Sequence, residues 1–249
     1  MGTETRVALV TGGTRGIGRA ITDRLTRSGV TVAAAYAQDV AAAQAVRDDG
    51  ARRGATVTLH QADVGQPASC QSLVGEVLEQ HGRLDYLVNN AGMVNEQRLS
   101  EISHEDWHRQ VAVNLSSAFF VSQAALAHMT QQRFGRVVNI GSVTALLGSP
   151  VQVAYGAAKG GIVGLTRSCA RAVARKGITV NCVIPGSFDT DMSAQLLYTD
   201  RDAVTSMIPV GRWGRPEELA HAVVFLLDDL ASYMTGAVLT VDGGMSMGG

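Results

Sequence analysis

Short apolar runs alternate with longer stretches of helical periodicity along this chain. The short runs are rich in β-branched residues and lack strict polar alternation, which is typical of strands buried on both faces. Strands are predicted at residues 7–10, 30–35, 55–59, 84–88, 136–140, 179–184 and 237–241. Helices are predicted between them, at residues 16–28, 39–53, 68–81, 104–133, 153–176 and 216–227.

This alternation predicts an α/β fold with right-handed crossovers between parallel strands. We expect a single Rossmann-like, doubly wound parallel sheet of about seven strands with helices on both faces. The chain has no linker-like stretch and no internal repeat, so residues 1–249 are expected to form one dinucleotide-binding and catalytic domain. The least regular segment, residues 188–213, is the candidate for a substrate lid.

Charge and cysteine usage narrow the class of protein. Lys and Arg (21) nearly balance Asp and Glu (22), which argues against a nucleic-acid partner. The three cysteines form no CxxC pair, which suits a reducing compartment. The first ten residues lack a signal-peptide pattern, and no apolar run reaches the ~20 residues of a membrane span. We therefore expect a soluble cytoplasmic protein with no membrane partner.

A glycine-rich turn follows the first predicted strand, where residues 11–18 read Thr-Gly-Gly-Thr-Arg-Gly-Ile-Gly. Glycines there let backbone amides approach a pyrophosphate at a helix N-terminus. The spacing differs from GxGxxG, and a turn without a ligand is the alternative. The cofactor-binding residues predicted in the turn are Gly12, Thr14, Arg15, Gly16, Ile17 and Gly18.

The end of the second predicted strand indicates which nicotinamide cofactor is used. NAD sites usually place Asp or Glu there for the ribose hydroxyl. Here Tyr36 and Ala37 occupy the position, and no carboxylate occurs before Asp39. A 2′-phosphate would meet no close negative charge, and Arg15 could supply its countercharge, unless it is simply a solvated arginine. The prediction is NADP(H).

Several motifs together resemble the short-chain dehydrogenases/reductases over the whole chain. They are the glycine turn, Asn89-Asn90-Ala91-Gly92, Asn114, Ser142, Tyr155-Gly-Ala-Ala-Lys159 and Pro185-Gly186. YxxxK alone is weak, but a serine 13 residues earlier and the other motifs make the combination specific. Residues 189–192, 208–218 and 241–245 look like those of 3-oxoacyl-(acyl-carrier-protein) reductases and the related acetoacetyl-CoA reductases and polyketide ketoreductases.

The resemblance implies a seven-stranded sheet, usually a homotetramer, and further cofactor contacts. Asp63 and Val64 would lie at the adenine, Asn90 and Gly92 near the ribose, and Ile184 and Thr190 at the nicotinamide. The remaining predicted cofactor-binding residues are Ala91, Pro185, Gly186, Tyr36, Ala37, Tyr155 and Lys159.

The predicted catalytic residues are Asn114, Ser142, Tyr155 and Lys159. Tyr155 would give a proton to the developing alkoxide, and Lys159, one helical turn away, should lower the tyrosine pKa. Ser142 would hydrogen-bond the substrate oxygen. By resemblance, Lys159 also grips the ribose and Asn114 holds a water that links the lysine to solvent.

Each of these residues has a structural alternative when it is taken alone. Tyr155 and Lys159 could be a helix-surface contact, Ser142 a cap or turn serine, and Asn114 a backbone-bonded side chain. Their joint placement favours the catalytic interpretation.

The run from His104 to His108 matches the zinc motif HExxH. Ser103 and Asp106 also fit a helix-capping box, and the resembled family uses no metal there. We therefore expect a helix start and no metal site.

Arg133 and Lys176 match basic positions that acyl-carrier-protein reductases use, and could steer an acidic carrier protein; the alternative is two solvated charges. The helices that end at these residues are the expected tetramer contacts. The leading function is NADPH-dependent reduction of a ketone to a secondary alcohol, most simply a 3-oxoacyl thioester of fatty acid or polyketide biosynthesis. Reduction or oxidation of another small ketone or alcohol (polyketide, sugar or steroid), or non-catalytic nucleotide sensing, stay open.

Overall fold

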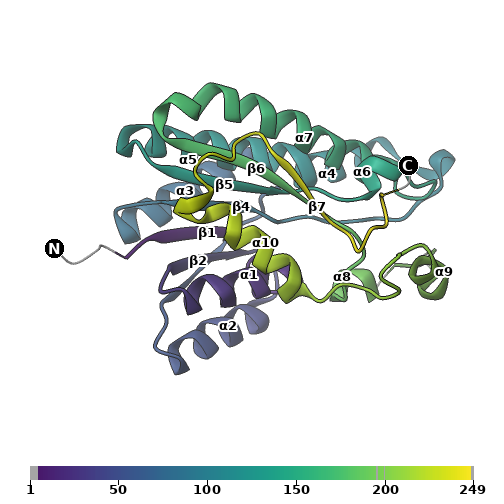
Figure 1. The fold of residues 1–249 in the computed structure, drawn as a ribbon, viewed down its shortest axis with the longest axis horizontal. Coiled ribbons are helices and arrows are strands. Elements are labelled where there is room, and N and C mark those ends of the chain that lie inside the picture. Colours follow the sequence, from purple (N-terminus) through teal and green to yellow (C-terminus); the bar gives the residue numbers. More distant parts are fainter. Residues whose placement is uncertain (1–4, 195, 199, 248–249) are drawn as a thin grey trace.

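Seven parallel strands form one sheet in the order β3-β2-β1-β4-β5-β6-β7 in the computed structural model, which describes residues 5–194, 196–198 and 200–247. The predicted doubly wound sheet is confirmed (Figure 1). The strands are β1 (Val7–Thr11), β2 (Thr31–Tyr36), β3 (Val57–Gln61), β4 (Tyr86–Asn89), β5 (Gly135–Ile140), β6 (Ile178–Pro185) and β7 (Val238–Val241). The strand order reverses between β1 and β4, which makes a crevice at their carboxyl ends.

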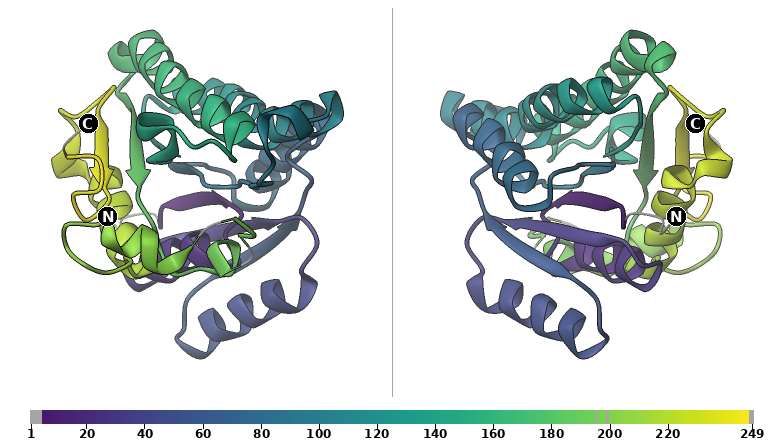
Figure 2. Two further views of the ribbon diagram at one scale, coloured as in Figure 1. Left: turned by 90° about the vertical axis from the view of Figure 1, so that its right-hand side faces the viewer. Right: turned by 90° about the vertical axis from the view of Figure 1, so that its left-hand side faces the viewer.

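Helices cover both faces of the sheet (Figure 2). One layer holds α3 (Pro67–His81), α4 (His104–Val111), α5 (Ser117–Gln132) and α7 (Val153–Val173). The other holds α1 (Gly16–Arg27), α2 (Val40–Arg52) and α10 (Pro216–Leu227). Three short helices, α6 (Thr144–Leu147), α8 (Asp191–Ala194) and α9 (Arg201–Ser206), lie beyond the carboxyl ends of the strands.

A hydrophobic cluster lies on each face of the sheet, which explains why the strands lack polar alternation. Leu9 on β1 packs toward α3 and α5, whereas its neighbour Val10 packs toward α1 and α10. Both side chains are fully buried, so successive residues of the strand meet apolar partners on opposite faces. Burial of each contributes roughly 1.5–3 kcal/mol to stability, and a polar residue at either position would lose it.

The segment 104–132 corrects one expectation. It is long and apolar enough to cross a membrane by length and composition alone. In the fold, however, Val121, Ala125 and Met129 of this segment are fully buried against the sheet. One face of the segment thus packs in the core, and a single segment that passes this test is weak evidence for a membrane span.

The predicted lid segment begins and ends at one place. Phe188 and Gly214 form a parallel bridge, and the backbone N–H of Asp189 donates to the carbonyl of Gly214 at 3.0 Å. Between these ends lie α8 and α9; residues 195 and 199 of the predicted lid lie outside the described residues. The segment is therefore a loop with a paired base, placed over the carboxyl ends of the strands (Figure 1).

Candidate active site

The glycine turn between β1 and α1 has a backbone that only glycine can supply. Gly12 and Gly16 have positive φ angles of 62° and 48°. A Cβ on Gly18 would lie 2.0 Å from the carbonyl oxygen of Gly12, so no side chain fits there. The first turn of α1 has no acidic residue and no side-chain cap. Its amide groups and helix dipole thus suit an anion such as a pyrophosphate.

Thr11 and Asn90 hold this turn against the end of β4. The Thr11 hydroxyl accepts from the backbone N–H groups of Asn90 and Ala91, both at 3.0 Å. The Asn90 side-chain amide donates to the carbonyls of Thr11 (2.9 Å) and Gly12 (3.2 Å). Asn90 thus stabilises the glycine turn, in addition to its predicted contact with the cofactor. Sequence reasoning overlooked Thr11, because a threonine at a strand end carries no distinctive signal.

Arg15 has a closer negative neighbour than the sequence suggested. Asp39 Oδ2 lies 3.9 Å from Arg15 Nη1, so the expectation that no carboxylate lies near is wrong. The other oxygen of Asp39 accepts from the N–H of Ala42 and caps α2, which explains why the carboxylate sits there. Both side chains of the pair are largely exposed, so the pair is weak and leaves Arg15 free to turn toward a phosphate.

Asp63, the predicted adenine contact, is engaged by α4. Arg109 donates to its carboxylate at 3.1 and 3.2 Å, and this guanidinium is the main reason that the pKa of Asp63 is lowered. The neighbouring Val64 is buried, whereas Tyr36 is partly exposed and Ala37 exposed at the end of β2.

Three of the predicted catalytic residues lie together beside the carboxyl end of β5. Tyr155 and Lys159 are one turn apart on α7, with the lysine nitrogen 5.8 Å from the centre of the tyrosine ring. Ser142, just beyond β5, is hydrogen-bonded to the Tyr155 side chain. The Lys159 ammonium is buried and donates to the carbonyl of Ile140 at 2.9 Å, which fixes its position.

Asn114 lies in a π-helical turn, η2 (Ala112–Ser116), that interrupts the helix predicted over residues 104–133. Its side-chain amide donates to the carbonyls of Gln110 (2.9 Å) and Met93 (2.8 Å), and its oxygen accepts from the N–H of Met93. The bond to Gln110 involves a carbonyl that a regular α-helix would pair with the backbone N–H of residue 114. Such π-turns are frequently found at functional sites.

Gly92 brings Asn114 and Lys159 to one point. A Cβ on Gly92 would lie 2.9 Å from Asn114 Oδ1 and 3.5 Å from Lys159 Nζ. Because glycine has no side chain, the amide and the ammonium share this small space. The structure therefore brings the fourth predicted catalytic residue next to the lysine.

Burial sets the electrostatics of these groups. It lowers the pKa of Lys159 to about 8, which a Coulombic interaction with Cys182 partly opposes. Burial raises the pKa of Tyr155, and the hydrogen bond with Ser142 opposes that rise. The net tyrosine pKa is therefore raised and not lowered, contrary to the expectation from the Lys159 charge alone, because burial is the largest effect on it. A tyrosine that keeps its proton is suited to act as an acid.

The remaining predicted cofactor residues line the same edge. Ile184 and Pro185 end β6, and a Cβ on Gly186 would lie 2.7 Å from Asp242. Thr190, at the start of the lid, would be 3.4 Å from a Cβ on Gly16, so the lid begins directly over the glycine turn.

The HExxH run begins α4, as expected from its capping residues. The Ser103 hydroxyl accepts from the N–H of Asp106 at 3.0 Å, and both His104 and His108 are exposed. Within residues 5–194, 196–198 and 200–247, no three acidic, histidine or cysteine side chains gather as metal ligands.

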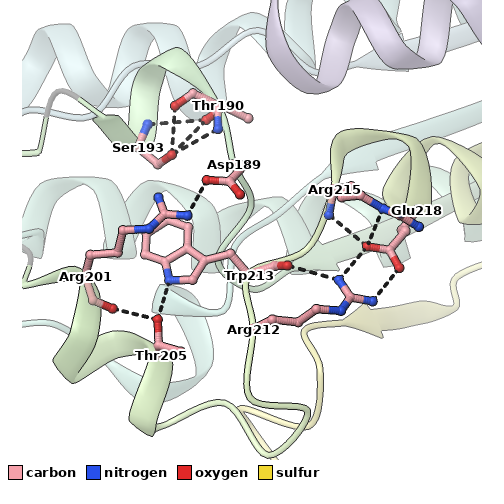
Figure 3. A network of polar contacts seen from close by, with 9 residues as sticks. All are labelled: Asp189, Thr190, Ser193, Arg201, Thr205, Arg212, Trp213, Arg215 and Glu218. Atoms are coloured by element: carbon pink, nitrogen blue, oxygen red, sulfur yellow. Dashed lines mark hydrogen bonds and ion pairs between the residues drawn. The ribbon is translucent and has the colours of Figure 1, made fainter.

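Polar contacts tie the two ends of the lid together (Figure 3). The Arg201 guanidinium lies 4.3 Å from the centre of the Trp213 ring and pairs with Asp189. The Trp213 indole donates to Thr205 at 3.0 Å. With Arg212, Arg215 and Gly211, these residues line a cavity of about 460 Å³.

Comparison with known proteins gives consistent matches over nearly the whole chain. A family model described as enoyl-(acyl carrier protein) reductase matches residues 12–246. The chain is 41% identical over 247 residues to a 3-oxoacyl-(acyl-carrier-protein) reductase of Escherichia coli, covering 99% of this chain and all of the relative. It is 39% identical over 243 residues to a reductase of the same name from Staphylococcus aureus, covering 98% and 99%. A solved short-chain dehydrogenase/reductase of Serratia marcescens, a double mutant, matches with a TM-score of 0.90 and 39% identity, covering 97% of this chain and 98% of that one.

Proposed function

This chain belongs to the short-chain dehydrogenase/reductase family, and we propose that it reduces the ketone of a 3-oxoacyl thioester to a secondary alcohol with NADPH. The observation that carries the proposal is the hydrogen bond between Ser142 and Tyr155 beside the buried Lys159. Two hydroxyl groups that converge on one point can both donate to a ketone oxygen. The full-length similarity to reductases named for 3-oxoacyl substrates supports the choice of thioester.

The residues that would hold the dinucleotide fit it. Gly12, Gly16 and Gly18 permit the tight backbone that presents the amides of the first turn of α1 to a pyrophosphate, and Gly92 lets Asn114 and Lys159 approach one point. When bound, NADPH would supply the hydride that the ketone carbon accepts.

The protein side chains then stabilise the developing charge and supply the proton at the ketone oxygen. Ser142 donates a hydrogen bond to this oxygen, and Tyr155 transfers its phenolic proton to it as negative charge develops. The Lys159 ammonium stabilises the phenolate that remains, and it would also hold the ribose hydroxyls of the bound dinucleotide. Asn114, next to the lysine nitrogen, holds the water through which the proton is replaced.

We assign the preference for NADPH over NADH to Arg15, because Tyr36 and Ala37 stand where NAD sites carry an acidic residue, and the exposed pair with Asp39 leaves the guanidinium able to turn to a 2′-phosphate. The specificity constant, kcat/KM, should be much larger for NADPH. Arg15→Gln should weaken NADPH binding and leave NADH binding unchanged, as measured by titration of intrinsic fluorescence. A wild-type preference for NADH would contradict this assignment.

The description of the matching family model names a different reduction, that of a carbon–carbon double bond. Ser142 and Tyr155 favour the ketone, because they place two hydrogen-bond donors where an oxygen gains charge. A 2-enoyl thioester is therefore the discriminating second substrate.

Arg133 and Lys176 are proposed to steer an acyl carrier protein. Both side chains are exposed, and a Cβ on Gly177 would lie 2.6 Å from the Arg133 carbonyl, so the two residues adjoin. They lie at the amino ends of β5 and β6, roughly 30 Å along α7 from Tyr155. Replacing both with alanine should lower kcat/KM for the carrier-bound thioester and leave that for the coenzyme A thioester unchanged.

We also propose that the protein forms a homotetramer and that it is located in the cytoplasm. The partly exposed ring of Phe119 on α5 supports contact between subunits through this helix layer. The three free thiols suit a reducing compartment. Light scattering would give the mass of the assembly in solution.

The deciding experiment follows NADPH absorbance with purified protein and a panel of carbonyl compounds. We expect the fastest decline with a 3-oxoacyl thioester, and slow or no decline with a 2-enoyl thioester, a keto sugar or a keto steroid. If another ketone were reduced faster, the substrate assignment would be wrong. If NADPH bound and no compound oxidised it, a nucleotide-sensing role would replace the enzymatic one.

A further inference from the structure

Glu96 is a buried residue whose carboxylate connects the lid to the loop before α7, the helix that carries Tyr155 and Lys159. It is 7% exposed and lies after β4, four residues beyond Gly92. One oxygen accepts from the side-chain amide of Gln152 at 2.9 Å, and the other accepts from the backbone N–H of Tyr198 at 2.7 Å. Tyr198 belongs to the lid, and Gln152 is the N-cap residue of α7. One side chain therefore bridges two segments that are far apart in sequence.

The loop that carries Glu96 is held on both sides. Before it, Met93 exchanges two hydrogen bonds with the Asn114 side chain, and Asn95 does the same with Gln110. After it, the N–H of Gln97 donates to the carbonyl of Val151 at 2.8 Å. Fixed neighbours limit where the carboxylate can point, so Glu96 offers the lid a preorganised acceptor.

Gln152 continues the connection toward the candidate catalytic serine. Its side-chain oxygen accepts from the Thr144 hydroxyl at 3.1 Å, and the N–H of Thr144 donates to the Ser142 hydroxyl at 3.2 Å. Gln152 also precedes Tyr155 by three residues, within the first turn of α7. Gln152 and Thr144 thus connect Glu96, which contacts the lid, to Ser142, which is proposed to bind the ketone oxygen.

The lid can transmit this contact because its ends are tied together. Arg201 contacts both Trp213 and Asp189, as Figure 3 shows, so α9 is anchored to the base of the lid. Thr190 reaches the glycine turn at the same base. Tyr198 lies between α8 and α9. The lid therefore contacts the glycine turn through Thr190 and contacts Glu96 through Tyr198.

We propose that Glu96 is a positioning residue, which latches the lid at Tyr198 onto Gln152 and so aligns Ser142 for reaction with the substrate. The inference rests on the proposed function for its kinetic consequence, but the latch itself is measurable without a substrate. Hydrogen bonds to a buried carboxylate are stronger than those between neutral groups, so their loss should be visible in both readouts.

The first test replaces Glu96 with alanine. Amide hydrogen exchange of peptides that contain Tyr198 should accelerate at least tenfold, and kcat/KM for a 3-oxoacyl-coenzyme A thioester should fall about ten- to a hundredfold. The dissociation constant of NADPH should change less than twofold, because no cofactor-binding residue is touched. Glu101→Gln, at an exposed residue of the short 3-10 turn that follows this loop, is the matched control; glutamine can still cap that turn, so none of these values should change.

The second test uses the polarity of the Glu96–Gln152 pair. Gln152→Glu places a second carboxylate against Glu96 and should reproduce the loss by repulsion. Combining it with Glu96→Gln restores a carboxylate–amide pair and leaves an oxygen for the N–H of Tyr198. The double variant should therefore recover to within about threefold of the wild type, which a simple loss of folding would not do.

Unchanged exchange at Tyr198 in Glu96→Ala would refute the latch. Loss of NADPH affinity as large as the loss of kcat/KM would refute the positioning role, and so would a double variant no better than Gln152→Glu. If the wild type reduces no 3-oxoacyl thioester, the proposed function fails, while the exchange measurement still decides whether Glu96 holds the lid.

Discussion

The glycine turn and the lid face each other at the candidate site, and they are held in different ways. The turn is fixed by its own backbone: Gly18 has no room for a Cβ, and Thr11 and Asn90 bond directly to neighbouring main-chain groups. The lid is fixed by side chains that come from distant parts of the chain, such as Glu96, and by largely exposed ion pairs such as Arg201 with Asp189. A backbone-determined region should tolerate almost no change, whereas the lid should lose function gradually.

The largest effect is expected at the chemical centre beside the turn. Tyr155→Phe removes the proton donor and should lower kcat at least a hundredfold, the usual worth of a positioned acid. NADPH affinity should stay within twofold, as measured by fluorescence titration. Tyr233→Phe, at a fully exposed tyrosine, is the control. A Tyr155→Phe enzyme with near-normal turnover would exclude this residue as the acid.

A glycine pair tests whether the turn is determined by its backbone. Gly18→Ala forces a Cβ against the Gly12 carbonyl and should lower the free energy of unfolding by about 1–3 kcal/mol, with loss of NADPH binding. Gly75→Ala, in α3, meets nothing within 4 Å and should raise stability by about 0.5–1 kcal/mol. Urea denaturation of both variants checks the contrast. Equal effects would show that the turn relaxes.

The pH profile tests the buried lysine. Because burial lowers the pKa of Lys159 to about 8, the residue is an ammonium below that pH and neutral above it. The raised pKa of Tyr155 keeps the phenol protonated over the same range. Thus kcat/KM for NADPH should be constant below pH 7.5 and then fall, approaching tenfold per pH unit. A profile that is flat from pH 6 to 10 would contradict this assignment.

The smallest effect is expected within the lid. Arg201→Gln removes the contact with Trp213 and the ion pair with Asp189. The two charged side chains of this ion pair are largely exposed to solvent. The free energy of unfolding should change by less than about 1 kcal/mol, while KM for the thioester rises severalfold. Arg47→Gln, in an exposed pair on α2, is the control and should leave KM unchanged. A large loss of stability would mean that the lid is part of the core.

The electrostatic details show the limit of reading chemistry from spacing. Spacing places Lys159 on the same face of α7 as Tyr155, and the structure agrees. It cannot say that the lysine nitrogen donates to Ile140 and that burial raises the tyrosine pKa. Likewise, the interval from Arg15 to Asp39 gives no hint that the two side chains come within 3.9 Å. Both depend on how separate elements pack.

The sequence by itself determined the order of strands and helices, the glycine turn, and the residues gathered at the strand ends, because local periodicity and backbone requirements are written in neighbouring residues. Only the tertiary structure revealed the π-turn at Asn114, the role of Thr11, and the bridge from Glu96 to Tyr198. Such contacts join side chains from segments separated by tens of residues. Their geometry arises from packing around the sheet, which no local pattern encodes.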